Sequence, residues 1–226
     1  MKLIGKVLPK SIKKKLRKHY FQQFKTNHIK QSEHIPKPNI QQQHIQNARL
    51  LSSRVSLLEV LPKNGVVAEL GVDEGNFSQQ IFDKSEPSKL YLVDFWGTSR
   101  YNETKKKLVH KKFENQMING KVEIKLGFSF DTAQSFEDST FDWIYIDTDH
   151  SYETTKKELA AWAPKIKPNG MICGHDYVMG NWNSLWKYGV IEAVHEFCIS
   201  ENWEIIFLTT EMSPNPSFAI RRLASG

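Results

Sequence analysis

The chain has 226 residues, of which 39% are hydrophobic, so it is long enough for one well-packed domain and an extension. No apolar run approaches the roughly 18 residues that a membrane span needs, and two cysteines exclude a disulfide framework. The apolar stretch in residues 1–9 is too short for a signal-peptide core, so we expect an intracellular, cytoplasmic protein.

The net charge of +6 is unevenly distributed along the chain. Residues 1–30 contain ten Lys or Arg and no acid, which leaves 21 basic and 25 acidic residues for the remainder. An enzyme acting on nucleic acid more often carries its basic surface on the domain itself. The charge distribution therefore argues against a nucleic-acid partner.

The basic N-terminal segment has its own pattern. Apolar residues recur at every fourth position from residue 12: Ile12, Leu16, Tyr20 and Phe24. Lysines fill much of the rest, so the pattern predicts a basic amphipathic helix. Two interpretations stay open: residues 1–30 contact an anionic membrane, at its inner face, or an acidic partner; or the apolar stripe packs on the protein's own domain or on a second subunit of a homo-oligomer. We expect residues 1–38 to form an arm with a linker, and residues 39–226 to form the main folded domain.

The remaining pattern predicts a doubly wound α/β domain. A helix is expected over Ile45–Leu61. The expected strands are Val66–Leu70, Leu90–Asp94, Lys121–Leu126, Phe141–Ile146, Met171–Cys173, Trp203–Leu208 and Ser217–Arg221. The helices expected between them are Asn76–Asp83, Tyr101–Gln116, Thr132–Phe136, Tyr152–Ala163 and Val190–Ser200. This alternation favours a mostly parallel sheet covered by helices on both faces. The last two strands have no helix between them and should pair antiparallel.

Such a sheet binds ligands at the carboxyl ends of its strands. After the first of these strands, Gly71 and Gly75 allow a sharp turn and the close approach of a ligand. Glu69 beside them suits a ligand with an ammonium group, whereas a phosphate would be repelled by the acids in this loop.

The next two strand ends also carry candidate ligand-binding residues. An acid at the end of the second strand, Asp94, commonly accepts hydrogen bonds from both hydroxyls of a ribose. The third strand is followed by Phe128 and Ser129, where an adenine ring could lie. Capping of a helix by Asp94 and core packing of Phe128 are the structural alternatives.

The fourth and fifth strands end in the densest polar clusters, which contain Asp147, His150, His175 and Asp176. If these strands are neighbours, two carboxylates and an imidazole, from Asp147, His175 and Asp176, converge as a ligand set for a divalent ion. The imidazole of His150 is a candidate proton acceptor. The structural alternative is that the acids cap the following helix.

Four stretches give the chain a family resemblance: AELGVDEGNFSQQI, LYLVDFWG, FDWIYIDTDHSYE and PKIKPNGMICGHDY. With them, roughly the last 160 residues resemble the class I S-adenosylmethionine-dependent methyltransferases. The similarity is strongest to the metal-assisted O-methyltransferase branch, which includes the catechol and macrolide-sugar O-methyltransferases.

The resemblance implies a Rossmann-like seven-stranded sheet with an antiparallel last strand, preceded here by a helical extension. It implies that Glu69, Gly71 and Gly75 line the methionine half of S-adenosylmethionine, that Asp94 holds the ribose and that Ser129 lies near the adenine. The implied metal ligands, for Mg²⁺ or Mn²⁺, are Asp147, His175 and Asp176, with His150 as general base. The chain departs from its relatives at His175, where they usually have a carboxylate.

The function expected from these observations is methyl transfer to an oxygen of a hydroxylated small molecule, such as a sugar or a polysaccharide precursor. The segment of residues 178–188 is rich in Gly, Asn and Trp, so Trp182 and Trp186 either stack on that acceptor or pack on the domain or at a dimer contact. Two other functions stay open: a metal-dependent hydroxylase or hydrolase on the same fold, and a non-catalytic docking protein that uses the basic arm.

Overall fold

The computed structural model describes residues 9–181, 186–213 and 215–224. Its contacts divide the chain into two compact units, Met1–Lys37 and Pro38–Gly226. Trp182, one of the two tryptophans expected beside the acceptor, lies outside the described residues. None of the helices in the described ranges combines the length and apolar character that a bilayer-spanning helix needs.

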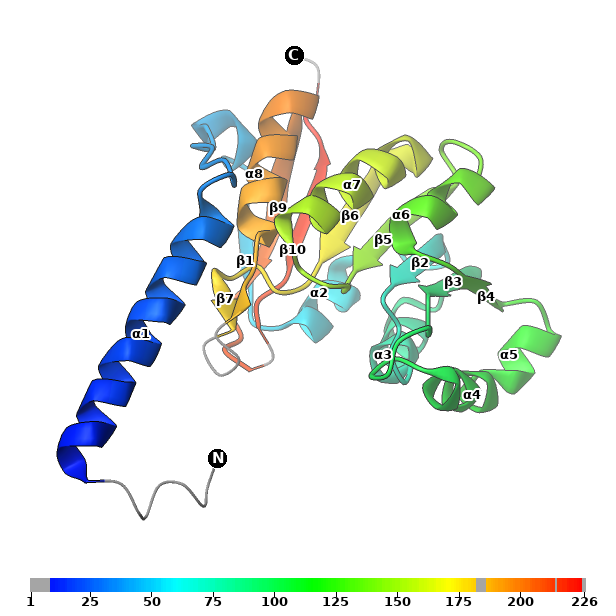
Figure 1. The fold of residues 1–226 in the computed structure, drawn as a ribbon. Helices are drawn as coiled ribbons and strands as arrows, with labels where there is room; N and C mark the ends of the chain where they lie inside the picture. The colour runs from blue at the N-terminus through cyan, green and yellow to red at the C-terminus, as the bar shows by residue number, and fades with distance from the viewer. Residues whose placement is uncertain (1–8, 182–185, 214, 225–226) are drawn as a thin grey trace. The chain divides into compact units, whose positions relative to one another are not determined.

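The first unit contains one helix, α1 (Lys10–Ser32) (Figure 1). The expected basic helix is therefore present, and Ile12, Leu16 and Tyr20 are exposed on it. The side chain of Phe24 lies outside the described residues. Phe21 is also exposed, and at 3.6 residues per turn it lies on the side opposite Ile12. The apolar side chains of α1 are thus spread more widely than a single stripe.

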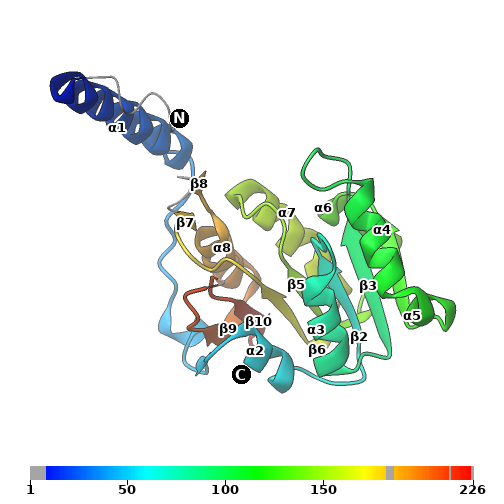
Figure 2. The same cartoon turned by 90° about the horizontal axis from the view of Figure 1, so that it is seen from below.

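The second unit is built on one eight-stranded sheet, ordered β1-β9-β10-β6-β5-β2-β3-β4 (Figure 1). Figure 2 shows strands β2 and β3 of this sheet from below. The strands are β1 (Arg49–Leu51), β2 (Val66–Leu70), β3 (Lys89–Asp94), β4 (Val122–Leu126), β5 (Phe141–Ile146), β6 (Ile166–Gly174), β9 (Trp203–Thr209) and β10 (Phe218–Arg222). Only β10 runs antiparallel to its neighbours in this sheet, β6 and β9, as expected for the last strand. A separate two-stranded hairpin is formed by β7 (Gly180–Asn181) and β8 (Trp186–Lys187).

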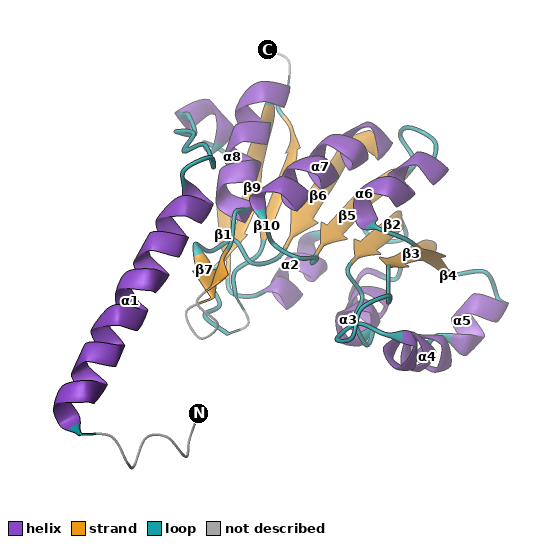
Figure 3. Ribbon diagram, in the orientation of Figure 1, coloured by secondary structure: helices purple, strands orange, loops and turns teal. Residues whose placement is uncertain are grey.

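Helices alternate with these strands along the chain, which confirms the doubly wound α/β class (Figure 3). They are α2 (Arg54–Val60), α3 (Asn76–Ser85), α4 (Glu103–Lys112), α5 (Glu114–Ile118), α6 (Ser129–Thr132), α7 (Tyr152–Trp162) and α8 (Val190–Glu201). Helix α7 packs beside α6 and α8, and α2 packs beside α3. The expected helix over residues 101–116 is divided into two helices at Phe113, which ends α4 and precedes α5. Asn102 caps the start of α4.

The predicted helix over Ile45–Leu61 is wrong as far as Ser53, and only Arg54–Val60 is helical. A 3₁₀ turn at Gln42–His44 is followed by β1, which pairs parallel with β9 and adds an eighth strand to the expected seven. The His44 ring bonds the Trp203 carbonyl at 2.7 Å, which fixes this segment to the sheet edge. Helix α2 starts only after Ser53, whose hydroxyl accepts a hydrogen bond from the Ser56 amide.

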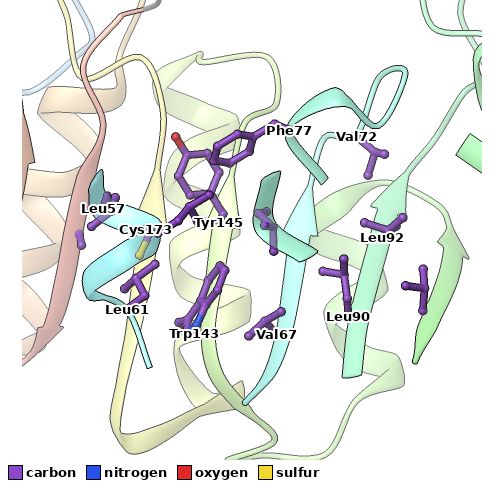
Figure 4. Close-up of a cluster of buried hydrophobic side chains, with 14 of the residues drawn as sticks. Leu57, Leu61, Val67, Val72, Phe77, Leu90, Leu92, Trp143, Tyr145 and Cys173 are labelled. Carbon is purple, nitrogen blue, oxygen red and sulfur yellow. The ribbon is translucent and has the colours of Figure 1, made fainter. Parts of the chain in front are cut away.

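The core between β5 and the α2–α3 pair contains large side chains (Figure 4). Trp143 and Tyr145 of β5 are fully buried, and Leu57 of α2 and Phe77 of α3 pack into the same cluster. The Phe77 and Tyr145 ring centres are 4.5 Å apart. Burial of such side chains contributes about 1.5–3 kcal/mol each, so this cluster holds α3, and the turn that precedes it, firmly against the sheet.

The carboxyl ends of β2, β3, β5 and β6 are aligned at one edge of the sheet. Register pairs Leu70 with both Val93 and Ile146, and Ile146 with Gly174. The residues that follow continue this ladder: the amides of Gly71, Asp147 and His175 donate to the neighbouring strands at 2.7–2.9 Å. The chain also reverses its order between β2 and β5, the position where open α/β sheets bind ligands.

Candidate functional site at the strand ends

The glycine turn after β2 is pressed against the residue that follows β5. Gly71 has a φ of 88°, and a Cβ there would lie 2.0 Å from the Asp147 carbonyl oxygen. Gly75, with a φ of 71°, is the residue from which α3 starts. Both predicted glycines are therefore required by backbone geometry, and Gly71 in addition brings the first and fourth of the expected strand ends into contact.

The carboxylate of Asp94 fixes the glycine turn by accepting hydrogen bonds from the backbone amides of the turn. One carboxylate oxygen accepts hydrogen bonds from the amides of Val72 and Asp73, at 2.8 and 3.0 Å. The other accepts one from the Trp96 amide at 3.1 Å. Since a carboxylate offers about four acceptor positions, one remains for a ligand hydroxyl.

Glu69 lies beneath this turn and is only 1% exposed. Its carboxyl group accepts a hydrogen bond from the Ser78 hydroxyl of α3. Burial raises the pKa of Glu69 to about 8, although the bond from Ser78 opposes this rise. Contact of Glu69 with a ligand ammonium stays a prediction.

Ser129 is tied to the strand end at Asp147 through Glu158 of α7. The Ser129 hydroxyl donates to one oxygen of this carboxyl group, and the Thr148 hydroxyl donates to the other at 3.1 Å. Glu158 is fully buried, and burial raises its pKa to about 7. Phe128 is half exposed and stacks on Phe95, with ring centres 4.4 Å apart, so it is not a core residue.

The four predicted residues of the acid–imidazole cluster meet after β5 and β6. His175 Nδ1 lies 3.6 Å from Asp147 Oδ1 and 3.5 Å from Asp176 Oδ2. His150 Nε2 is 2.9 Å from Asp176 Oδ2 and 4.0 Å from Asp147 Oδ1. The other oxygen of Asp176 accepts a hydrogen bond from the Asn215 amide group. The expectation that these side chains converge is met by the geometry.

Two members of this cluster have left-handed backbone, with φ of 62° at His150 and 55° at Asp176. Asp and His adopt this region more readily than most residues, but it still needs support from the surroundings. The His150 carbonyl accepts from the Gly189 amide at 2.9 Å, and the Asp176 carbonyl accepts from the Val178 amide at 2.7 Å. These contacts hold both side chains toward the shared space.

Opposite charges dominate the electrostatics of the cluster. Burial alone would lower the pKa of His175, but the carboxylates of Asp147 and Asp176 raise it to about 9. Burial opposes ionisation of Asp176, yet the bonds from His150 and His175 hold its pKa well below the usual range. The two carboxylates thus require positive charge between them, which protonated imidazole supplies here.

The same cluster can accommodate a divalent ion. Donor atoms of Asp147, His175 and Asp176 all lie within 4.8 Å of one another. Ligands about 2.1–2.4 Å from one ion are at most about 4.2–4.8 Å apart, so the three donors fit around a single cation. His175 Nε2 is buried with no hydrogen-bond partner among the described residues.

Three residues of the site were not singled out from the sequence. Arg54 Nη1 lies 3.6 Å from Asp147 Oδ2, and the Tyr188 ring centre lies 4.9 Å from that of His150. Arg54 gave no signal because its place in the site depends on how α2 packs on α3. Glu158 did give one: it shares the inward pattern of α7 with Thr155, Leu159 and Trp162, where an acid is unusual.

Comparisons with known proteins agree with this arrangement. Residues 68–177, which run from β2 to just beyond β6, match the family model described as a methyltransferase domain. No curated protein sequence matches the chain.

Several solved structures share the fold at low sequence identity. A protein from Corynebacterium glutamicum is 11% identical, with a TM-score of 0.57 over 91% of this chain and 90% of that one. A protein described as a putative rRNA methylase from Clostridium thermocellum is 12% identical, with a TM-score of 0.57 over 76% and 95%. The Bacillus subtilis m1A22 tRNA methyltransferase TrmK is 15% identical, with a TM-score of 0.53 over 76% of this chain and 66% of its own, just under two thirds. At these identities the likeness is one of fold.

The family match covers the strand ends that carry Glu69, Asp94, Asp147 and His175, and the sheet has the reversed strand order at their centre. Residues 68–177 thus match a methyltransferase domain and the solved structures share its fold, which together support an S-adenosylmethionine-dependent methyltransferase.

Proposed function

We propose that this enzyme transfers the methyl group of S-adenosylmethionine to a hydroxyl oxygen of a small molecule, with help from a divalent ion. The observation that supports this most is the cluster of Asp147, His175 and Asp176, whose donor atoms lie within 4.8 Å of one another. It lies directly beside the glycine turn, since Gly71 touches Asp147. Donor and acceptor would then meet at near-attack distance.

The chemistry of such a transfer is an in-line displacement, in which the acceptor oxygen must become more nucleophilic. A divalent ion held by the three ligands would lower the pKa of a hydroxyl that reaches it. His150 is 19% exposed at its side chain and lies beside Asp176, so it is placed to accept the proton. His150 would then act as the general base, a role that donor binding does not require.

An acceptor with a ring, such as a sugar, is favoured by the walls of the site. Tyr188 lies against His150, and the hairpin that precedes Tyr188 carries Trp186, which is half exposed. Aromatic side chains of this kind provide an apolar face for a ring while leaving its hydroxyl groups free to bind. The acidic balance of residues 31–226 favours a small molecule over nucleic acid.

The experiment is a calorimetric titration followed by a transfer assay. We expect S-adenosylmethionine to bind wild-type protein, and Mn²⁺ to bind wild type but not Asp147→Ala. Labelled donor is then offered to panels of sugars, catechols and, as a comparison, RNA. Donor binding with transfer only to RNA would contradict the small-molecule acceptor, and wild-type turnover by Asp147→Ala would contradict the metal-assisted mechanism. Metal-dependent oxidation or hydrolysis without donor binding would support the hydroxylase or hydrolase alternative.

A further inference from the structure

The side chain of Arg54 is held at the junction of the glycine turn and the acid–imidazole cluster. Its backbone amide donates to Glu211 Oε1 at 2.7 Å, just after the Ser53 cap of α2. Its guanidinium carbon lies 4.2 Å from the centre of the Phe77 ring, which belongs to the first turn of α3. The guanidinium is therefore fixed in position on an aromatic face beside the start of α3.

This guanidinium has unused hydrogen-bonding capacity. Its five N–H groups can bind a carboxylate with two parallel bonds. The described residues accept no hydrogen bond from it: its nearest acid is Asp147, at 3.6 Å from Nη1. The side chain is 21% exposed, so a ligand can reach it.

Lys105 at the glycine turn is already paired with Asp73 and Glu74, so one end of the expected donor still needs a charged partner. The amino-acid end of S-adenosylmethionine carries an ammonium and a carboxylate group. Asp147 would repel the carboxylate, and Glu69, already bonded to Ser78, offers it no positive charge. The carboxylate of the donor therefore needs a cation beside the turn. Arg54 can supply it, because its guanidinium lies against Phe77 of α3, the helix that follows the turn.

We propose that Arg54 binds the carboxylate at the amino-acid end of S-adenosylmethionine and so determines specificity for the complete donor. This inference rests on the proposed donor site at the glycine turn. The competing role is purely positional: Arg54 would only orient Asp147 for catalysis. The two roles predict different affinities. If Arg54 binds the carboxylate, its replacement weakens binding only of a donor that has this carboxylate.

The test measures, by calorimetry, the affinity of full-length protein for S-adenosylmethionine and for decarboxylated S-adenosylmethionine. Wild type, Arg54→Gln and Arg54→Lys are compared. Arg49→Gln is the matched control, because Arg49 is an exposed residue of edge strand β1, with its guanidinium 5.8 Å from the Phe207 ring centre. Thermal unfolding of each variant verifies that it is folded.

We expect Arg54→Gln to weaken binding of S-adenosylmethionine about ten- to a hundredfold, as for loss of hydrogen bonds to a charged group. Its affinity for the decarboxylated ligand should stay unchanged. Arg54→Lys should fall between wild type and Arg54→Gln, because lysine keeps the charge but not the planar fork. Arg49→Gln should bind both ligands as wild type does.

Equal weakening of both ligands in Arg54→Gln, or no change in either, would overturn the assignment. If wild-type protein bound neither ligand, the donor site itself would be wrong, and this proposal with it. The two failures are distinguishable, because the first leaves binding of S-adenosylmethionine to wild type intact.

Discussion

The two halves of the strand-end site are built differently. At the end of β3, Asp94 accepts hydrogen bonds from three backbone amides, and beneath the neighbouring turn Glu69 is closed by Ser78. At the ends of β5 and β6, the carboxylates of Asp147 and Asp176 instead face imidazoles, two of the contacts being 3.5 and 3.6 Å long. The acids of the first half are satisfied by backbone amides and the Ser78 hydroxyl, whereas the ion-pair contacts of Asp147 in the second half are all 3.6 Å or longer.

This difference separates scaffold from chemistry. Polar groups that bond their own backbone fix the shape of a loop, and their loss costs folding free energy. Polar groups that converge on one space with their bonds incomplete are available to a ligand, and their loss costs function. The comparison therefore predicts which substitutions should affect stability and which should affect turnover.

The largest expected effect is on turnover in the acid–imidazole cluster. We expect Asp147→Asn to reduce kcat by at least about 10²-fold, because it removes a carboxylate from the proposed ligand set of the ion that activates the acceptor hydroxyl. Asp94→Asn should mainly lower the free energy of unfolding, by about 1–3 kcal/mol, since an amide nitrogen cannot accept the backbone bonds. Steady-state kinetics and chemical denaturation measure the two effects.

The assignment of Asp94 to the scaffold and of Asp147 to the chemistry is wrong if Asp94→Asn and Asp147→Asn change stability and turnover equally. Loss of stability in Asp147→Asn as large as that in Asp94→Asn would assign a scaffold role to both. Asp83→Asn, an exposed substitution in α3 outside the site, is the control and should change neither quantity measurably.

A second prediction concerns pH and the buried carboxyl group of Glu69. Its pKa is about 8 in the folded protein, against an ordinary value of 4.5 for a solvated glutamate, so folding favours the protonated form. The free energy of unfolding of wild type should therefore fall relative to that of Glu69→Gln as pH rises from about 4.5 through 8. At about 1.4 kcal/mol per pKa unit, the total fall is on the order of 4 kcal/mol. Below pH 4.5 the difference in stability between the two proteins should no longer change with pH.

Chemical denaturation of the donor-free protein at pH 4, 6, 8 and 9 checks this difference. Glu59→Gln provides the control, because Glu59 is an exposed acid paired with Lys84 at 3.2 Å. A constant difference between wild type and Glu69→Gln across this range would show that the carboxyl group ionises as freely in the folded protein as in the unfolded chain.

The smallest expected effect on catalysis belongs to the basic arm. Replacing Lys14, Lys15 and Lys18 by Glu in the full chain should leave kcat unchanged within error, because these residues belong to the first unit. If the arm contacts anionic membranes, wild type should sediment with phosphatidylserine-containing vesicles at low salt, and the variant should stay in the supernatant. Wild type remaining in the supernatant as well would leave docking on protein as the use of the arm.

Most of the sheet could be predicted because its signals are local. Short apolar runs bounded by glycine or acidic residues indicated β2, β3 and β5, and the missing helix between β9 and β10 indicated their antiparallel pairing. The acids and histidines at the strand ends followed from one rule, that parallel strands end at one edge. The convergence of His175 with Asp147 required no more than that.

What could not be predicted depends on contacts between distant segments. Strand β1 forms because Arg49–Leu51 meets the edge of β9, about 160 residues later, and no local pattern reports such a partner. Arg54 entered the site for the same reason, since its place follows from how α2 packs on α3. The bond from Asn215 to Asp176 joins a connecting loop to a strand end, which the sequence order alone does not indicate.

The contact between Gly71 and the Asp147 carbonyl has a consequence for how this enzyme can be altered. Any side chain at residue 71 would collide with that carbonyl, so it would shift the carboxylate of Asp147 as well as the turn. Engineering that reshapes the binding of one reactant through this pair would disturb the other. Changes of acceptor preference are better sought in the β7–β8 hairpin and Tyr188, which lie on the His150 side of the site and do not share that contact.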